Sequence, residues 1–252
     1  MQFFLEYYYN RVNIIMLKLS PRLQIVYDMV PPCGVVADVG CDHGYLTISL
    51  LENGVADSAI AMDINAGPLK KAEENIRIAG FSSKVSLRIS NGLQKLEENE
   101  ADVICICGMG GTLIGKIIVA EERVAKSAST LIIEPQSDYF SLRKTLMEMG
   151  FVIIDEDLTC EENKIYPIIK LYYEPDESER VSLNEAQLEY GPVIIKKVPE
   201  LLIKLLDKNQ QEYSSILRSL ESKDGDKSDA ILSRMEQLRH ELDLIAQVRN
   251  TI

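Results

Sequence analysis

The segment VVADVGCDHGYL (35–46) contains residues whose types and spacing suit a ligand site. An apolar run ends near Asp38, Gly40 and Gly44 follow, and a second apolar run begins after them. A glycine-rich turn between a strand and a helix lets the backbone approach a nucleotide-like ligand. Asp42, however, stands where a dinucleotide fingerprint carries its second glycine, and its carboxylate would repel a pyrophosphate. S-adenosylmethionine has no phosphate and carries an ammonium and a sulfonium, so the turn favours that ligand.

Two further polar residues follow later apolar runs. Asp63 ends the run SAIAMDI, 25 residues after Asp38, where a carboxylate can accept hydrogen bonds from both ribose hydroxyls of an adenosine. Taken alone, Asp63 could instead simply cap the helix that follows it. Asn91, in SNGL (90–93), can contact the adenine amine, although Asn-Gly is also common in plain turns. Together these residues favour an adenosine-containing ligand.

The segment CGMGGT (107–112) places three glycines in four positions after another apolar run. These glycines allow close approach to a ligand, or simply form a tight strand–helix turn. Methyltransferases that act on exocyclic amines usually carry a D/N-P-P-aromatic motif at this place, and that motif is absent. A ring nitrogen with its own lone pair, or some other acceptor, is therefore favoured over an exocyclic amine as the methyl acceptor.

The elements that must position these turns alternate between strand and helix. Such alternation predicts an α/β fold with a mainly parallel sheet and helices on both faces. Two adjacent strand-like runs without a helix between them predict a closing antiparallel hairpin. The expected strands are 35–40, 58–64, 84–91, 101–108, 129–136, 151–162 and 165–175. The expected helices between them open over 45–51 and span 67–80, 112–125 and 138–150.

The character of the chain changes after Pro175. Residues 176–185 are polar and read as a linker, and apolar residues then repeat at spacings of three and four. Two heptad-like helices, separated by the polar segment ESKDGDKSD, predict an antiparallel helical hairpin. The hairpin is either a substrate arm or a packing and dimerisation element, and the sequence leaves both open. The repeating positions are Leu202, Leu206, Asn209, Tyr213, Ile216 and Leu220, then Ile231, Met235, Leu238, Leu242 and Ile245.

Charge and cysteine content limit the possible partners. The 252 residues carry a net charge of −12, so nucleic acid could bind only through a local basic patch. Five cysteines and two histidines show no zinc spacing, which favours buried reduced thiols and no metal. No secretory or membrane-spanning segment is evident, so we expect no membrane partner and a cytoplasmic location. Candidate patches are Arg11, Lys18 and Arg22; Arg143 and Lys144; and Lys196 and Lys197.

Five motifs in this order and spacing resemble the bacterial TrmK family, tRNA methyltransferases that modify N1 of adenine at tRNA position 22. They are LSPRL (19–23), ADVGCDHGYL (37–46), AMDINAGPL (61–69), NGL (91–93) and GMGG (108–111). The resemblance implies a Rossmann-like class I methyltransferase domain over 17–175 and a C-terminal α-helical, coiled-coil-like hairpin over 176–252. It also implies S-adenosylmethionine as cofactor and tRNA as substrate. Residues 1–16 are an extension, and we expect the functional chain to begin near Met16.

Mapped residue by residue, the resemblance implies a set of site residues. Asp42 is the expected catalytic or positioning carboxylate. One departure is EPQSD (134–138), where the family pattern is QPN and Glu134 adds a charge near the target base. The expected substrate contacts are Arg22, Gly111, Lys196 and Lys197. The expected cofactor contacts are Arg22, Asp38, Gly40, Asp42, His43, Gly44, Asp63, Ile64, Asn91, Gly92, Leu93, Gly108, Met109 and Gly110.

The expected reaction is direct methyl transfer to adenine N1, which has a lone pair at neutral pH and needs no strong base. A nearby carboxylate would stabilise the cationic product, and the adenine must leave its base pair or stack. Three alternatives remain: a small-molecule methyltransferase, a nucleotide-dependent dehydrogenase, and a binding protein built around the hairpin. The oligomeric state is open, with a monomer favoured.

Overall fold

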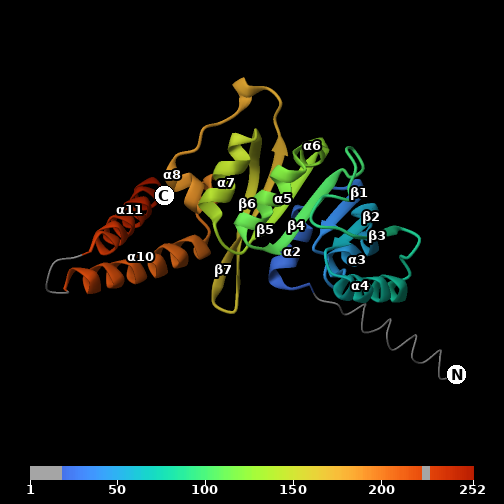
Figure 1. Ribbon diagram of the computed structural model, residues 1–252, viewed down its shortest axis with the longest axis horizontal. Helices are drawn as coiled ribbons and strands as arrows, with labels where there is room; N and C mark the ends of the chain where they lie inside the picture. Colours follow the sequence, from blue (N-terminus) through green and yellow to red (C-terminus); the bar gives the residue numbers. More distant parts are fainter. Residues whose placement is uncertain (1–18, 223–227) are drawn as a thin grey trace. The chain divides into compact units, whose positions relative to one another are not determined.

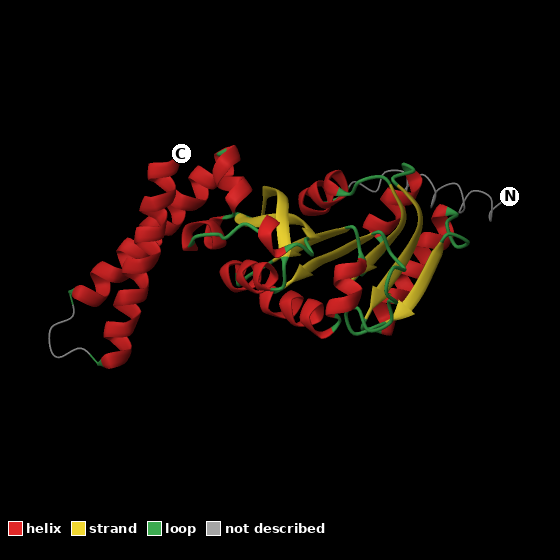
Figure 2. Cartoon of the chain, turned by 90° about the horizontal axis from the view of Figure 1, so that it is seen from above, coloured by secondary structure: helices red, strands yellow, loops and turns green. Residues whose placement is uncertain are grey.

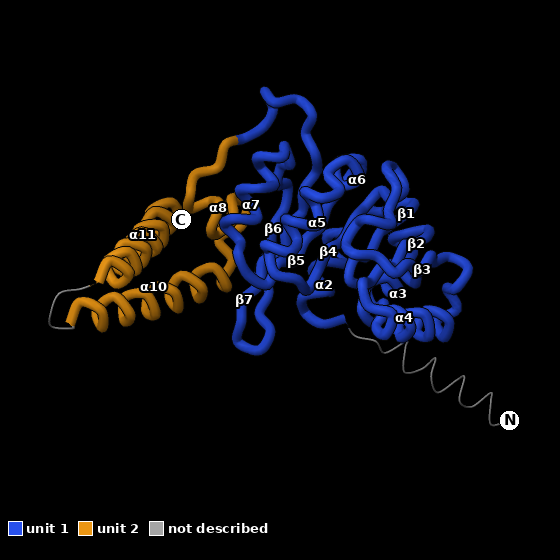
Figure 3. The backbone as a smooth tube through the Cα atoms, in the orientation of Figure 1, with its two compact units in different colours: residues 1–181 blue, residues 182–252 orange. Residues whose placement is uncertain are grey.

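The computed structural model describes residues 19–222 and 228–252. The predictions for residues 1–16 therefore lie outside the described part, as do the candidate cations Arg11 and Lys18. The chain divides into two compact units, one ending at Val181 and the other spanning Ser182–Ile252 (Figure 3). The boundary expected from composition was six residues earlier, after Pro175.

The first unit is built on a seven-stranded sheet with the order β3-β2-β1-β4-β5-β7-β6 (Figure 1). The first five strands are parallel, and β7 runs antiparallel to both β5 and β6. The α/β fold and its closing antiparallel hairpin are thus confirmed. The strands are β1 (Cys33–Val39), β2 (Ala56–Asp63), β3 (Val85–Ile89), β4 (Val103–Met109), β5 (Thr130–Pro135), β6 (Phe151–Glu161) and β7 (Lys164–Tyr173).

Helices cover both faces of this sheet (Figure 2). One face packs against α2 (Pro21–Met29), α3 (Tyr45–Glu52) and α4 (Ala66–Ala79). The other packs against α5 (Gly111–Ala120), α6 (Glu122–Ser127) and α7 (Tyr139–Glu148). The helices of the β1–β2, β2–β3 and β4–β5 crossovers thus lie on the sheet, as expected for a doubly wound fold, whereas the β3–β4 connection contains no helix.

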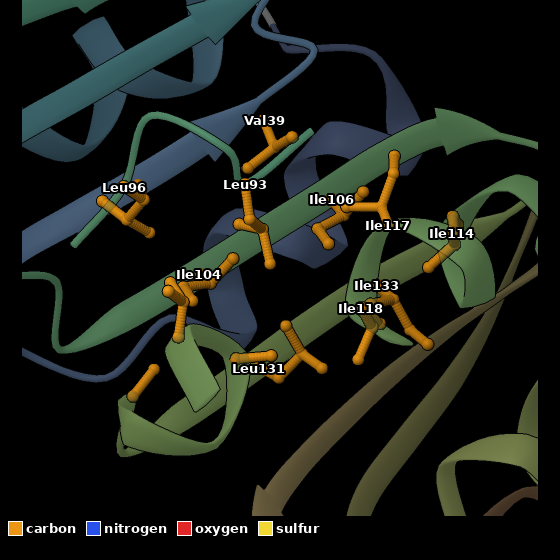
Figure 4. Close-up of a cluster of buried hydrophobic side chains, with 14 of the residues drawn as sticks. Val39, Leu93, Leu96, Ile104, Ile106, Ile114, Ile117, Ile118, Leu131 and Ile133 are labelled. Atoms are coloured by element: carbon orange, nitrogen blue, oxygen red, sulfur yellow. The ribbon is translucent and has the colours of Figure 1, made fainter. Parts of the chain in front are cut away.

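Strand β4 shows why both faces are filled. Successive side chains of a strand point to opposite faces, so Val103 and Cys105 pack under the α2–α3 layer. Ile104 and Ile106 instead face the α5 side, where Ile114 and other helix residues cover them (Figure 4). All four β4 side chains are at most 1% exposed, which explains the continuous apolar run in this strand.

One helix prediction was wrong in detail. The run 112–125 was expected to form a single helix, but it divides into α5 and α6. Glu121 leaves the helical region, with φ −124° and ψ 47°, and serves as the N-cap of α6. No glycine or proline marks this break, so the sequence pattern did not predict it.

The second unit contains the predicted antiparallel hairpin and two short helices that the heptad pattern did not indicate. Arg249 pairs with Asp207 and Arg239 with Glu221, so the two long helices run in opposite directions. An Asn184–Gln187 capping box starts the first short helix. The helices are α8 (Glu185–Tyr190), α9 (Pro192–Lys197), α10 (Glu200–Glu221) and α11 (Asp229–Thr251); a 3₁₀ turn, η1 (Glu177–Glu179), lies in the expected linker.

Candidate functional site

The predicted turns meet at the carboxyl edge of the parallel strands, where the strand order reverses between β1 and β4. Ligands of open α/β sheets bind at this switch point. Two neighbouring cavities open here, one of about 220 Å³ and one of about 470 Å³. They share four lining residues, Gly40, Asp42, Cys107 and Gly108, so they form one continuous site.

The turn after β1 needs its glycines. Gly40 and Gly44 have φ values of 77° and 73°, in the left-handed region that favours glycine. A Cβ on Gly40 would lie 2.5 Å from Cε of Met109, a side chain on the wall of the larger cavity. Gly40 lines both cavities and Met109 lines the larger one, whereas Gly44 packs against Ala72 of α4 and lines neither cavity.

Asp38 lies at the end of β1 and is only 4% exposed. Thr47 donates a hydrogen bond from its hydroxyl to Oδ2 of Asp38, over 2.7 Å. Burial raises the pKa of Asp38 to about 6, although the Thr47 hydrogen bonds oppose this shift. The smaller cavity therefore has a buried carboxylate that titrates far above the ordinary range of an aspartate.

Asp42 occupies the junction of the two cavities. Its φ of 48° is left-handed, and its side chain is 65% exposed. His43 lies beside it, with Nε2 3.5 Å from Oδ2 of Asp42, and stacks on Tyr45 at a centroid distance of 5.4 Å. Asp42 thus lines both cavities and carries an exposed carboxylate.

The larger cavity is formed by the ends of β2 and β4 and by the loop after β3. Asp63 ends β2, and its Oδ1 accepts the N–H of Asn65 over 2.8 Å. Asn65 is the N-cap of α4, and no side chain caps the start of this helix, so Asp63 holds the backbone just before α4 and does not cap it. Asp63 also lines the cavity, together with Asn91 and with Ile64, which is 58% exposed.

The loop after β3 also explains one glycine. Gly92 has a φ of 60°, and a Cβ there would lie 2.7 Å from a methyl carbon of Ile117. The Ser90 hydroxyl donates to the Gly92 carbonyl over 2.8 Å and fixes the turn. Gly92 lines the cavity, whereas the side chain of Leu93 is fully buried in the core and lines neither cavity.

The turn after β4 is interlocked with the segment after β5. The N–H of Gly111 donates to the Ser137 carbonyl over 3.0 Å, and that of Gln136 to the Met109 carbonyl over 2.8 Å. A Cβ on Gly111 would collide with the backbone oxygen of Ser137, so this position requires glycine. Gly108 lines both cavities, while Gly110 lines neither and Gly111 lies on a separate groove between α5 and α7.

Arg22 reaches the smaller cavity from the first turn of α2, which Ser20 caps and Pro21 begins. Its Nε lies 2.5 Å from Oε2 of Glu161, and its Nη1 lies 3.5 Å from Oε1 of Glu134. Its guanidinium also stacks over Tyr166, 4.7 Å from the ring centroid. Protein carboxylates and an aromatic ring thus hold Arg22 at the cavity wall.

Several lining residues were not among the expected site residues. Ser20, Tyr45 and Ser90 line the cavities, and Glu134 was noted only as a departure from the family pattern. Tyr45 and Ser90 are next to predicted residues in the chain, and this neighbourhood was the one sequence feature that could have identified them. Glu134 comes from a strand whose turn carries no glycine fingerprint.

One basic candidate was wrong. Arg143 is 1% exposed, and its Nε donates to Oε1 of Glu156 over 2.9 Å. Glu156 is itself fully buried, so Arg143 belongs to an internal ion pair and offers no surface to nucleic acid. Lys196 and Lys197 are exposed in the last turn of α9, within the second unit.

The cysteines are free thiols, but they are not uniformly buried. Cys41 and Cys105 are buried, and burial raises the pKa of both. Cys160 is exposed, contrary to the expectation of buried thiols. Within residues 19–222 and 228–252, no cluster of three or more His, Cys, Asp and Glu side chains could hold a metal ion, and no helix could cross a membrane.

Comparisons with known proteins show the family to which the chain belongs. Residues 19–169 match the family described as "Methyltransferase domain". The chain is 31% identical to the tRNA (adenine(22)-N(1))-methyltransferase of Bacillus subtilis, over 90% of this chain and 98% of the relative. The crystal structure of the B. subtilis tRNA methyltransferase TrmK superposes with a TM-score of 0.82 at 29% identity, covering 92% of this chain and 99% of that one.

A second solved structure carries a ligand. It is a putative tRNA methyltransferase of Streptococcus pneumoniae in complex with S-adenosyl-L-methionine. Its TM-score is 0.80 at 28% identity, and the match covers 92% of this chain and 99% of that one. The likeness therefore extends over both compact units.

Proposed function

Because the chain belongs to the methyltransferase-domain family and, within it, to the bacterial TrmK family, we infer that it is a tRNA (adenine-N1)-methyltransferase that uses S-adenosylmethionine. The observation that carries this function is the pair of joined cavities at the β1–β4 switch point, with Asp63 in one, Arg22 in the other and Asp42 at the junction. A dehydrogenase is excluded by the family, and the match over both units opposes a small-molecule substrate.

The residues of the larger cavity fit the adenosine part of the cofactor. Asp63 offers its carboxylate to the ribose hydroxyls, Ile64 gives an exposed apolar surface to the adenine, and Asn91 stands near its amine. Left-handed glycines at 40, 92 and 108 keep the walls free of side chains. When bound, the cofactor supplies an electrophilic methyl group on a sulfonium. The larger cavity would hold the cofactor by its adenosine part.

Asp42 is proposed to act on the reacting centre. Its support is its position at the junction and its exposed carboxylate, in contrast to the buried Asp38. A negative charge there stabilises the positive charge that appears on the adenine ring as the methyl arrives. Alignment of N1 with the methyl group supplies the remaining rate acceleration, because N1 needs no deprotonation.

The tRNA contacts are proposed to extend into the second unit. Neither part of the chain is basic: residues 175–252 carry 11 basic and 15 acidic side chains (−4), and the remainder 16 and 24 (−8). Binding must therefore use a patch, for which Lys196 and Lys197 on α9 are the proposed cations. Neutralising both should flatten the salt dependence of tRNA binding, whereas replacing both by arginine should preserve it.

Position 22 of tRNA is the proposed target, because the B. subtilis relative carries that position in its name. We expect the active enzyme to be a cytoplasmic monomer. The test is methyl transfer from labelled S-adenosylmethionine to an unmodified tRNA, followed by analysis of the nucleosides. We expect 1-methyladenosine; transfer to the exocyclic amine, or no transfer to tRNA, would refute the proposed reaction.

A further inference from the structure

Glu134 is a buried carboxylate for which the reaction described above has no role. It is the next-to-last residue of β5, is 2% exposed, and lines the smaller cavity, as Asp42 also does. Burial raises the pKa of Glu134 above its usual range, although the Gly108 N–H and Arg22 oppose the shift. A buried acid is costly to keep unless it has partners or a task.

The partners of Glu134 fix its orientation. Its Oε2 accepts the Gly108 N–H over 2.7 Å, which is a short, charge-assisted hydrogen bond. Its Oε1 lies 3.5 Å from Nη1 of Arg22, at the limit of hydrogen-bonding distance. Arg22 lies much closer to Glu161, at 2.5 Å, so Oε1 retains capacity to accept another hydrogen bond.

The strands and turns around Glu134 are also fixed. Residues 134–138 are tied to the turn after β4 by the Gly111–Ser137 and Gln136–Met109 backbone hydrogen bonds. The Thr112 hydroxyl lies 3.1 Å from Oδ2 of Asp138 and adds a third link. The carboxylate is therefore placed by the same turn, 108–111, that the cofactor and the target base must share.

We propose that Glu134 selects the target base by accepting a hydrogen bond from the exocyclic amine of the adenine whose N1 is methylated. This inference rests on the proposed function. Adenine presents an amine donor beside an N1 lone pair. The amine can donate to the fixed carboxylate while the N1 lone pair faces the methyl group. Guanine presents a carbonyl oxygen and an N1–H at the same two places, so its oxygen would face the carboxylate and be repelled.

The same contact favours the reaction itself. The bond from N1 to the methyl carbon forms while the carbon–sulfur bond breaks, and the sulfur leaves as a neutral thioether. The positive charge passes to the adenine and is shared between N1 and the exocyclic nitrogen. No proton has to move during the transfer. The amine is thus a stronger donor in the transition state than in the substrate, so its bond to Glu134 strengthens as the reaction proceeds.

The test removes each side of this contact in turn. Single-turnover methylation by the full-length protein is measured on a tRNA with adenine at the target position and on the same tRNA with unsubstituted purine, which lacks the amine. Wild-type protein should lose about 10- to 100-fold in rate on purine, the range expected for a hydrogen bond to a charged group. Glu134→Ala should lose a similar factor on adenine and be nearly indifferent to the amine.

Two more variants make the outcome decisive. Glu134→Gln keeps an acceptor for the Gly108 N–H, so it tests the contact even if Glu134→Ala does not fold, and it should reduce the adenine-to-purine ratio several-fold. Glu161→Gln changes the other carboxylate that holds Arg22 and should leave that ratio at its wild-type value. A purely structural Glu134 would lower both rates equally, and an unchanged ratio in the variants would overturn the proposal. If wild-type protein methylates no adenine in tRNA, the proposed function itself fails.

Discussion

The two cavities of the site are lined by different kinds of groups. The larger one, with Asp63, Ile64 and Gly92, is bounded by loops that directly follow β2, β3 and β4, and its apolar wall at Ile64 is exposed. The smaller one contains the buried carboxylates Asp38 and Glu134 beside the cation of Arg22. Backbone shape and surface groups suit binding, whereas buried charges suit discrimination and the stabilisation of a developing charge.

This difference predicts where each kind of defect will appear. Changes in the larger cavity should weaken cofactor affinity and leave the transfer step largely intact. Changes in the smaller cavity should alter the rate of transfer, base selection or pH dependence, with less effect on affinity. Four substitutions test the division, beginning with the largest expected effect.

Asp63→Ala should weaken S-adenosylmethionine binding by 100-fold or more. The substitution removes charge-assisted hydrogen bonds to the ribose that contribute about 1.5–3 kcal/mol each. Calorimetric titration measures the loss. Asp57→Ala is the matched control, because Asp57 lies exposed on the same strand, away from both cavities. Unchanged affinity in a folded Asp63→Ala protein would remove Asp63 from the cofactor site.

Asp38→Asn should change how stability depends on pH. The folded protein raises the pKa of Asp38 from 3.8 to about 6, so it binds a proton more tightly than the unfolded chain does. Wild-type stability should therefore fall, relative to the variant, as pH rises from about 4 to about 6, by up to about 3 kcal/mol. The free energy of unfolding in urea, measured across this range, gives the comparison. Parallel curves for the two proteins would show that Asp38 does not titrate as stated.

Asp42→Asn should slow methyl transfer by roughly 10-fold and change cofactor affinity much less. Asparagine tolerates the left-handed backbone at this position, where φ is 48°, so the fold should be retained. Single-turnover rates at saturating cofactor and tRNA separate the chemical step from binding. Equal losses in rate and affinity would mean that Asp42 only binds the cofactor.

Gly92→Ala should have the smallest effect and should act through the wall of the larger cavity. The new methyl group would lie 2.7 Å from a methyl carbon of Ile117, and the alanine would have to adopt a φ of 60°. Gly54→Ala, at a φ of 66° with nothing within 4 Å, isolates the backbone strain, which is about 1 kcal/mol. We expect Gly92→Ala to cost about 1 kcal/mol more in urea unfolding than Gly54→Ala. Equal costs would indicate that Ile117 moves aside freely.

The two cavities also differ in how far the sequence could predict them. Asp63 and Asn91 follow strands directly, and the carboxyl ends of parallel strands meet at one edge, so position along the chain implied proximity. Arg22 and Glu134 lie 112 residues apart, and only the packing of α2 beside β5 brings them together. No local pattern carries that information.

Arg143 shows the same limit for charge. It precedes Lys144 in a helix and resembles a surface cation, yet it is paired with Glu156 inside the fold. Burial of an ion pair depends on a partner from another element, here β6. The heptad spacing of the tail, in contrast, is a local property of each helix, and the hairpin it predicted is present in α10 and α11.

The most direct test of the account is methylation of two tRNA transcripts that differ only at nucleotide 22, the position named for the B. subtilis relative. Purified full-length protein is supplied with labelled S-adenosylmethionine, and the labelled nucleotide is identified and located in each transcript. We predict one 1-methyladenosine at position 22 when adenine is present there and no labelled product when guanine replaces it. Equal labelling of both transcripts, or a methyl group on any other atom of adenine, would contradict the account.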